Sequence, residues 1–446
     1  MSNPANILIL GVGSGDDRVA ALEAASYRCT IEPAGSDVIA AIERHRPGVV
    51  LVSVAGLGGL DAITEIKGNA EARRVTVAAI DIGDAHDVLR ACREAGADDV
   101  FEDDTEDHVL VARMRALARL GGMEAELVRR AATAGEFGVT VGTDIPRDHD
   151  DGSGKLLVVG AAEGELEALC PLLPRSGITF VTEPDPYRAR SRIEGSENES
   201  FDGALVYVRN EEMREKCDYF CRAVRNDRRL FDLPLFLVTE HGAFPHHAAA
   251  YDEGANVVAE APVDCDFVDN HLHMLLRGRE RRYAIGRRIA ATVDEKTMDI
   301  LGNVYSSEFT RAHLDRLARE KAERGTFSSA ILFFVPTIGE VAALYGLEEA
   351  ALLRQQLASW LAALVRVEDT IGRTGADEFL ALLPETGMSE ADLVRKRVVG
   401  VLHQSEFRLT DNVPVGIEVY VQSGIAELRA GDSLEDTISR ASDLLE

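Results

Sequence analysis

Apolar and polar positions alternate with the same rhythm in two stretches of the chain. The short β-branched runs of the first stretch are ILIL after Asn6, VVLVSV ending at Val54, VTVAAID ending at Asp81 and GADDVF beginning at Gly96. Those of the second are KLLVVG ending at Gly160, GALVYV ending at Val208, LPLFLVTE ending at Glu240 and GANVV beginning at Gly254. Helical segments separate the runs, which is typical of βαβ units with a parallel sheet.

The two stretches are copies of one domain. Equivalent glycines lie 149 residues apart at Gly11 and Gly160, and 158 residues apart at Gly96 and Gly254, as expected for a duplication with a few loop insertions. From about Asp299 the chain again alternates helices with strands, among them SAILFFV and EVYVQSGIAEL. We therefore predict three α/β domains.

Polar and helical segments separate these domains. MEAELVRRAATAGEF predicts a helical extension, and TDIPRDHDDGSGK a linker rich in Pro, Gly and Asp. A helix with six arginines follows the second copy. The predicted parts are a first domain at 1–122, an extension and linker at 123–153, a second domain at 154–276, a connecting helix at 277–297 and a third domain at 298–446.

Composition narrows the range of partners. The 446 residues include 48 Lys and Arg against 76 Asp and Glu, a net charge of −28. So acidic a chain argues against nucleic acid and against anionic lipid as partners, because both bind clustered cations. No apolar run reaches the ~20 residues of a membrane-spanning helix, and MSNPANILIL lacks the features of a signal peptide. We expect a cytoplasmic protein.

The duplicated (βα)5 pattern resembles the flavodoxin-like receiver domains of two-component signalling. A working receiver needs an acidic pair after its first strand, an acceptor Asp after its third and a Lys after its fifth. In the first copy these positions hold Gly11 with Val12, Ser53 and Asp103; in the second they hold Gly160 with Ala161, Tyr207 and Ala261. Without carboxylates no hard cation is held, and without Lys the phosphoryl charge is not neutralised. Both copies are predicted to be pseudo-receivers.

Gly375-Ala-Asp-Glu-Phe379 lies between two apolar strands, with Arg373 before it and Pro384 at the end of the second strand. This segment resembles the GGDEF signature of diguanylate cyclases, with Ala376 as the one departure. The resemblance covers roughly residues 298–446. It implies an α/β GGDEF domain, similar to nucleotidyl cyclases, behind two receiver-type domains.

The resemblance also shows what this chain lacks. Where the family places its metal aspartates, lysine, Asn-Asp pair and guanine-reading Asn, the chain has Phe334, Pro336, Gly339, Ala342, Ala343 and Ser306. Asp377 and Glu378 remain, but one carboxylate cluster does not make a two-metal site for phosphoryl transfer. We interpret these two residues as turn residues that are retained by descent and not for catalysis. We expect no catalytic residues, no metal and no cofactor.

A second signature of the family is an R-x-x-D motif, at which members bind the product cyclic di-GMP. Its Asp lies six positions before the first Gly of the signature; here Asp369 lies six before Gly375, and Arg366 three before Asp369. A third family contact, an Arg on the following helix, corresponds to Arg397. Guanidinium groups pair with guanine O6 and N7, and a carboxylate accepts from the guanine N–H groups. The alternative interpretation is a local Arg366–Asp369 salt bridge on a solvated surface.

The resemblance thus implies a cyclic di-GMP receptor without catalysis, bound through Arg366, Asp369 and Arg397. It further implies a cell-cycle adaptor, a homodimer at a cell pole, that recruits proteins through its pseudo-receivers and delivers a regulatory protein to an AAA+ protease. Two alternatives stay open: a weak or residual diguanylate cyclase, and a structural partner of an active cyclase that binds no nucleotide.

Overall fold

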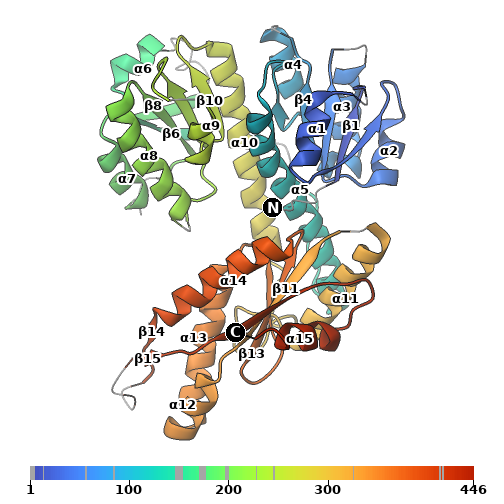
Figure 1. Cartoon of the computed structure of the whole chain (residues 1–446), viewed down its shortest axis with the longest axis vertical. Helices are drawn as coiled ribbons and strands as arrows, with labels where there is room; N and C mark the ends of the chain where they lie inside the picture. Colours follow the sequence, from blue (N-terminus) through green and yellow to red (C-terminus); the bar gives the residue numbers. More distant parts are fainter. Residues whose placement is uncertain are drawn as a thin grey trace.

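We describe a computed structural model of the protein, which covers residues 6–13, 15–55, 58–83, 86–145, 154–169, 177–195, 200–227, 229–244, 247–324, 326–410, 413 and 416–445. It contains three α/β domains, two side by side and the third below them (Figure 1). The predicted linker lies largely at 146–153, outside the described residues. Among the helices within the described ranges, none is long and apolar enough to cross a membrane.

The first domain is a parallel sheet with strand order β2-β1-β3-β4-β5. Its strands are β1 (Asn6–Leu10), β2 (Arg28–Glu32), β3 (Val49–Ser53), β4 (Thr76–Ile80) and β5 (Asp99–Val100). The helices are α1 (Asp17–Ala24), α2 (Val38–His45), α3 (Gly59–Gly68), the 3-10 turn η1 (Ala72–Arg74), α4 (His86–Ala95) and α5 (Asp107–Glu136). The interior strands β3 and β4 are almost wholly buried, which explains their continuous apolar runs.

The second domain repeats this topology with the order β10-β9-β8-β6-β7. Its strands are β6 (Gly154–Val159), β7 (Ile178–Glu183), β8 (Gly203–Val208), β9 (Leu235–Thr239) and β10 (Val257–Glu260). Its helices are α6 (Glu163–Leu169), α7 (Pro186–Glu194), α8 (Glu211–Asn226), α9 (His247–Asp252) and α10 (Cys265–Ala290). The prediction of two flavodoxin-like (βα)5 domains is confirmed. The half-exposed edge strands β2 and β7 have no continuous apolar run, and the sequence pattern did not single them out.

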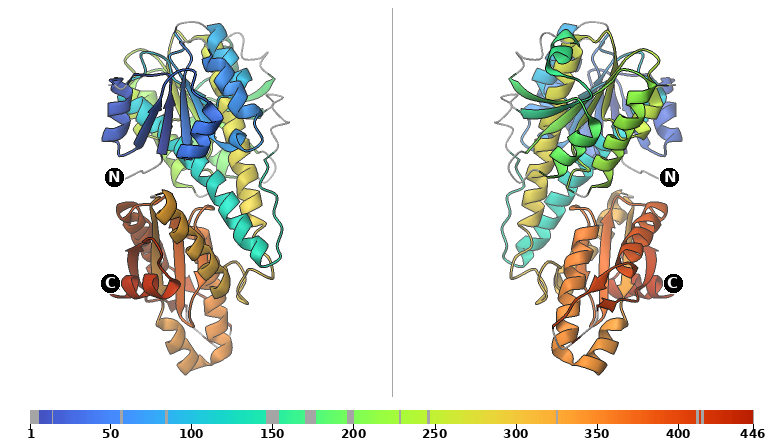
Figure 2. Two further views of the ribbon diagram at one scale, coloured as in Figure 1. Left: turned by 90° about the vertical axis from the view of Figure 1, so that its right-hand side faces the viewer. Right: turned by 90° about the vertical axis from the view of Figure 1, so that its left-hand side faces the viewer.

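Two long helices extend from these domains toward the third. The predicted boundary at 122/123 falls inside α5, and the predicted boundary at 276/277 falls inside α10. The predicted helical extension and the predicted connecting helix therefore continue the last helix of the first and of the second receiver-type domain. The two helices pack against each other and run downward together (Figure 2). Asp264 caps the start of α10 by accepting from the Asp266 N–H. A rigid two-helix stem therefore joins the receiver-type domains to the third domain.

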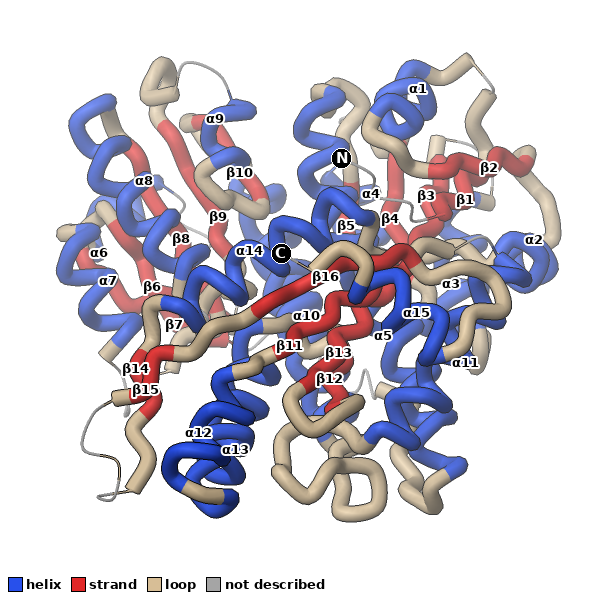
Figure 3. Tube along the Cα trace, turned by 60° about the horizontal axis from the view of Figure 1, so that its bottom comes forward, coloured by secondary structure: helices blue, strands red, loops and turns tan. Residues whose placement is uncertain are grey.

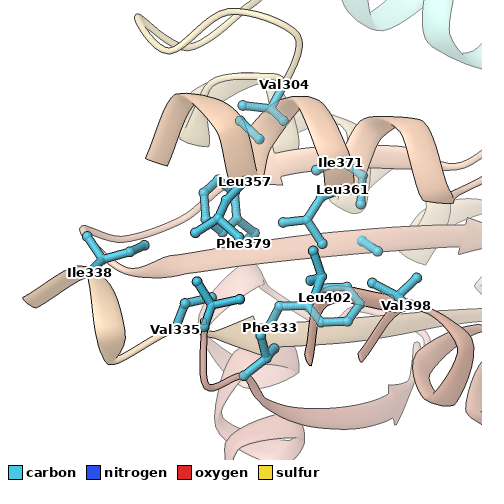
Figure 4. Close-up of a cluster of buried hydrophobic side chains, with 14 of the residues drawn as sticks. Val304, Phe333, Val335, Ile338, Leu357, Leu361, Ile371, Phe379, Val398 and Leu402 are labelled. Atoms are coloured by element: carbon cyan, nitrogen blue, oxygen red, sulfur yellow. The ribbon is translucent and has the colours of Figure 1, made fainter. Parts of the chain in front are cut away.

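The third domain is an antiparallel sheet with the order β12-β13-β11-β16 (Figure 3). Its strands are β11 (Ser328–Phe334), β12 (Thr370–Arg373), β13 (Glu378–Pro384), β14 (Glu406–Phe407), β15 (Ile417–Glu418) and β16 (Gln422–Glu427). Its helices are α11 (Ser307–Arg324), α12 (Thr337–Tyr345), α13 (Leu347–Leu364), α14 (Met388–His403) and α15 (Leu434–Ser442). Phe333, Phe379, Leu357 and Leu361 lie in its largest apolar cluster, which anchors the sheet against α13 (Figure 4).

A buried ionic cluster joins α5 to the third domain. Glu126 is fully buried, and Arg129 and Arg130, one turn further along α5, both donate to its carboxylate. His313 Nε2 of α11 lies 3.0 Å from the same carboxylate, and Arg129 also donates to Glu320 of α11 at 2.9 Å. Burial alone would raise the pKa of Glu126, but His313 and the two arginines hold it well below its usual range. The carboxylate is therefore charged and holds two buried arginines.

Removing this carboxylate should destabilise the protein. Glu126→Ala leaves Arg129 and Arg130 buried without their shared partner, a loss of about 3 kcal/mol or more in the free energy of unfolding. Because the folded-state pKa is depressed, the contribution of Glu126 is present above its unfolded pKa of about 4.3 and is lost as the pH falls further. Urea denaturation of the full chain at pH 7 and at pH 3 or below measures both effects.

The control is Glu136→Ala, which removes an exposed carboxylate near the end of the same helix, paired with Arg316. That variant should lose no more than about 1 kcal/mol. Equal losses in the two variants would contradict the importance of the buried cluster.

Candidate ligand-binding site

The Gly375–Phe379 motif forms the turn between β12 and β13, as predicted. Thr374 N–H donates to the Glu378 carbonyl at 3.1 Å, which closes the hairpin. Two arginines fix its outer side: Arg354 of α13 donates to the Ala376 carbonyl at 2.9 Å, and Arg373 to the Gly375 carbonyl at 2.9 Å. Arg373 also pairs with Asp299 at 3.2 Å. The hairpin is rigid and its loop is held by cations.

Beside this hairpin, apolar residues occupy the positions where the sequence comparison expected metal ligands. Phe334 pairs with Glu378 across β11 and β13, while its neighbours Phe333 and Val335 point into the core (Figure 4). Pro336 precedes α12, and the Asp377 carboxylate lies 3.8 Å from Arg354. An arginine beside Asp377, one of the two retained carboxylates, disfavours a divalent cation through like-charge repulsion. These donors do not fit a two-metal site.

At the other positions where the family has nucleotide-binding residues, this chain has almost no polar side chains that could contact a nucleotide. Gly339 and Ala343 lie on α12 and are exposed, and Ala342 is half-buried on the same helix. Ser306 lies before α11, where its Oγ accepts from the Phe309 N–H at 3.2 Å. Across the ranges that the structure describes, no group of three or more His, Cys, Asp or Glu residues could hold a metal ion.

The R-x-x-D motif forms a tight turn between α13 and β12, which we call turn 366–369. Asp369 N–H donates to the Arg366 carbonyl at 3.0 Å, and the Asp369 carboxylate accepts from the Arg366 N–H at 2.9 Å. The Arg366 side chain is exposed, whereas Asp369 is 6% exposed. The Arg366 backbone N–H therefore joins the two residues, and the Asp369 carboxylate is buried rather than placed on a solvated surface as the alternative interpretation has it.

Arg397 lies next to the same turn. It is exposed on α14, and its Nη2 donates to the Leu364 carbonyl, two residues before Arg366, at 3.0 Å. Arg366 and Asp369, assigned from their spacing to Gly375, and Arg397, assigned from the family resemblance, therefore lie at or next to one turn: two exposed arginines and one shielded carboxylate. This set can offer parallel donors to a purine edge or phosphate and an acceptor to a purine N–H group.

Opposing effects act on the pKa of the Asp369 carboxyl group. Burial and the neighbouring Glu368 carboxylate raise its pKa to about 7, although the charge of Arg366 and its backbone N–H oppose the rise. A carboxyl group with this pKa changes charge near neutral pH. A ligand that donates to Asp369 favours the ionised form, so its affinity should increase as the pH rises through 7.

Sequence reasoning missed two arginines that contact turn 366–369. Arg119 and Arg130 lie on α5, and both donate to residues of the turn. Arg119 lies in the segment predicted as the end of the first domain and Arg130 in the predicted helical extension, but nothing in a helical arginine indicates its distant partner.

The residues that the resemblance assigns to the acceptor position lie at or near the end of the third strand of each receiver-type domain. Ser53 ends β3, and Tyr207 lies in β8 with its hydroxyl donating to Glu240. Near Ser53, Arg18 pairs with Asp16 and Asp81, both at 2.6 Å. Arg18 therefore offsets part of the negative charge of these two carboxylates.

Comparison with known proteins places the third domain in a family. Residues 296–446 match the family described as diguanylate cyclase, GGDEF domain. These residues form a GGDEF domain. The whole chain is similar to the response regulator PleD of Caulobacter vibrioides, at 23% identity over 431 residues, which cover 95% of this chain and 91% of PleD.

Solved structures match this GGDEF domain weakly. The structure of the GGDEF domain of DgcB from Caulobacter crescentus, in complex with c-di-GMP, is 19% identical to this chain. The match covers 34% of this chain and 85% of the DgcB chain, with a TM-score of 0.32. SiaD from Pseudomonas aeruginosa, in complex with its activator SiaC, is 23% identical, covers 33% of this chain and 55% of that one, and has a TM-score of 0.31. Scores this low add nothing to the assignment.

Replacing the Asp369 carboxyl group tests its raised pKa. A raised folded-state pKa means that the folded protein holds this proton more tightly than the unfolded chain, so stability falls as the pH rises from about 4 to 7. Asp369→Asn keeps an acceptor for the Arg366 N–H and cannot ionise. We expect its thermal midpoint to lie close to that of the wild type below about pH 4 and to exceed it increasingly as the pH rises to 8. A lower midpoint at pH 8 would instead indicate a stabilising, ionised Asp369.

Proposed function

We propose that the protein is a receptor for cyclic di-GMP that performs no nucleotide cyclisation. The observation that carries the proposal is turn 366–369 with Arg397 beside it, at the register of the family's product-binding site. The paired guanidinium groups suit the guanine O6 and N7 acceptors and the two phosphates of the ligand. The Asp369 carboxylate suits the guanine N1–H and N2–H donors.

Loss of catalysis is the second part of the proposal. A cyclase holds the GTP phosphates through divalent cations, and here Phe334 and Pro336 replace oxygen ligands while Arg354 lies beside Asp377. A weak or residual diguanylate cyclase is the first alternative, favoured by the retained Asp377 and Glu378. A structural partner of an active cyclase, without bound nucleotide, is the second.

The receiver-type domains would then provide protein-binding surfaces. Their sheets are fully formed, although Ser53 and Tyr207 stand at the acceptor positions. In this combination the chain resembles PopA, a non-catalytic relative of PleD. By that resemblance we propose a homodimeric cytoplasmic adaptor at a cell pole, which recruits a regulatory protein for delivery to an AAA+ protease in the cell cycle.

Ligand binding is tested by calorimetry with cyclic di-GMP and the full chain. A bidentate Arg–guanine pair is worth roughly 1–3 kcal/mol, so Arg366→Ala should weaken binding at least about tenfold. Arg397→Ala should also weaken it, as a separate base or phosphate contact. Lys396→Ala is the control: it removes the same charge one residue away, from a side chain that pairs with Asp392 at 2.7 Å. If a folded Arg366→Ala variant binds cyclic di-GMP with wild-type affinity, the R-x-x-D motif does not serve as the ligand-binding site.

Catalysis is tested by incubating the protein with GTP and Mg²⁺ or Mn²⁺. We expect no cyclic di-GMP above a buffer control, because the site lacks oxygen ligands to hold the metal ions against the phosphates. Turnover that Asp377→Asn abolishes would support the residual cyclase instead. Absence of both turnover and ligand binding would favour the structural partner.

A further inference from the structure

Helices α12 and α13 form a hairpin at the end of the GGDEF domain that lies farthest from the receiver-type domains (Figure 1). The inner faces of both helices belong to the domain core, where Ile338 of α12 and Leu357 of α13 are fully buried (Figure 4). Gly346, with φ +102°, makes the sharp corner between the two helices. The hairpin is therefore a packed part of the fold, and its outer face has a defined shape.

The outer face of the same hairpin is apolar. Leu344 is 74% exposed, Leu347 77% and Tyr345 39%, and the neighbouring Ala343 is exposed as well. A single exposed leucine is ordinary, but adjacent exposed apolar side chains form a patch, and such patches mark contact surfaces. We call these four residues the α12–α13 surface.

Helix α12 has almost no polar side of its own. In its sequence, TIGEVAALY, only Glu340 is charged, so apolar residues point both into the core and out of the domain. A helix that is apolar all round is normally covered on every side. The composition of α12 therefore fits a helix whose outer side is covered by another molecule.

The charge around this surface is negative. Glu340 and Glu348 are both exposed and flank it on the two helices, and residues 325–353 contain no Lys or Arg. The next cation along the chain, Arg354, lies 3.8 Å from the Asp377 carboxylate, which offsets its charge. A molecule that covers the surface must therefore combine an apolar centre with cations at its edges.

A second copy of this chain does not meet that requirement. A two-fold interface places each surface against itself, so Glu340 and Glu348 of the two copies would come together. Like charges opposed in this way repel each other. The net charge of −28 on each chain adds to the repulsion.

We propose that the α12–α13 surface docks a basic amphipathic helix of a partner protein. Apolar side chains on one face of that helix would cover Leu344 and Leu347. Lys or Arg at the edges of the same face would pair with Glu340 and Glu348. A helix suits this site because the side-chain ridges of two packed helices leave grooves that accept a third.

The docking surface is separate from the proposed ligand site. It lies at the start of α13, whereas turn 366–369 follows the end of that helix, about 27 Å away at 1.5 Å per residue. The inference therefore goes beyond the proposed function and does not depend on ligand binding.

The test titrates a synthetic helix of roughly 15 residues, with leucine on one face and lysine on the other, into the full chain by calorimetry. The wild type should bind it, and Leu344→Ser/Leu347→Ser should bind it at least about tenfold more weakly, because two apolar contacts are lost. Glu340→Gln/Glu348→Gln should weaken binding about threefold, and added salt should reduce that difference. Absence of binding to the wild type would overturn the proposal.

The matched control is Leu393→Ser, which removes a leucine of similar exposure, 68%, from α14. This variant should bind the Leu–Lys helix within about twofold of the wild type, as expected for a surface change elsewhere. An equal loss of affinity for Leu393→Ser, or equal binding of a peptide with serine in place of leucine, would indicate unspecific attraction to an acidic chain. Either result would refute the docking surface.

Hydrogen exchange locates the bound peptide. The Leu–Lys helix should slow exchange at residues 337–351 and leave residues 388–403 unchanged. Sedimentation velocity tests the other occupant: wild-type dimers that Leu344→Ser/Leu347→Ser dissociates would overturn the partner helix in favour of a second copy. The same double variant should bind cyclic di-GMP like the wild type, so a failure of the docking surface and a failure of the proposed function are told apart.

Discussion

The arrangement of the domains depends on one buried charge, the carboxylate of Glu126. It holds Arg129 and Arg130 on the buried side of α5, where an unpaired guanidinium would be costly. From there Arg129 reaches α11 through Glu320, and Arg130 reaches turn 366–369 through two backbone carbonyls. A charge in the first receiver-type domain therefore sets the contacts of the third domain, and does so at the segment that we propose to bind ligand.

Within the GGDEF domain, the hairpin loop at Gly375–Phe379 and turn 366–369 are stabilised by different contacts. At the hairpin loop, Arg354 and Arg373 bind backbone carbonyls and leave one carboxylate, Asp377, beside a cation. At turn 366–369, backbone hydrogen bonds set the shape and leave two arginines exposed. The first arrangement uses its arginines to hold the loop, whereas the second leaves the Arg366 side chain exposed, as the proposed ligand contact requires.

The receiver-type domains keep their packing while the positions for phosphoryl chemistry hold other residues. Their link to the GGDEF domain is a pair of long helices, each a continuation of the last helix of its own domain, rather than a flexible tether. A helical stem transmits position over its length, because its backbone hydrogen bonds are satisfied internally. The position of the receiver-type domains relative to the GGDEF domain is therefore set by these two helices.

The sequence alone determined the features that depend on residues close together in the chain. Continuous β-branched runs located the buried strands of both (βα)5 domains, and the spacing of Arg366 and Asp369 to Gly375 located the turn, since neighbours in the chain are neighbours in space. It did not determine the half-exposed edge strands, the continuity of α5 and α10, or the burial of Asp369. Nor could it pair Arg119 with Glu368, 249 positions away. An arginine that faces solvent and one that contacts another domain have the same letter on a helix, and only the packing of the domains decides between them.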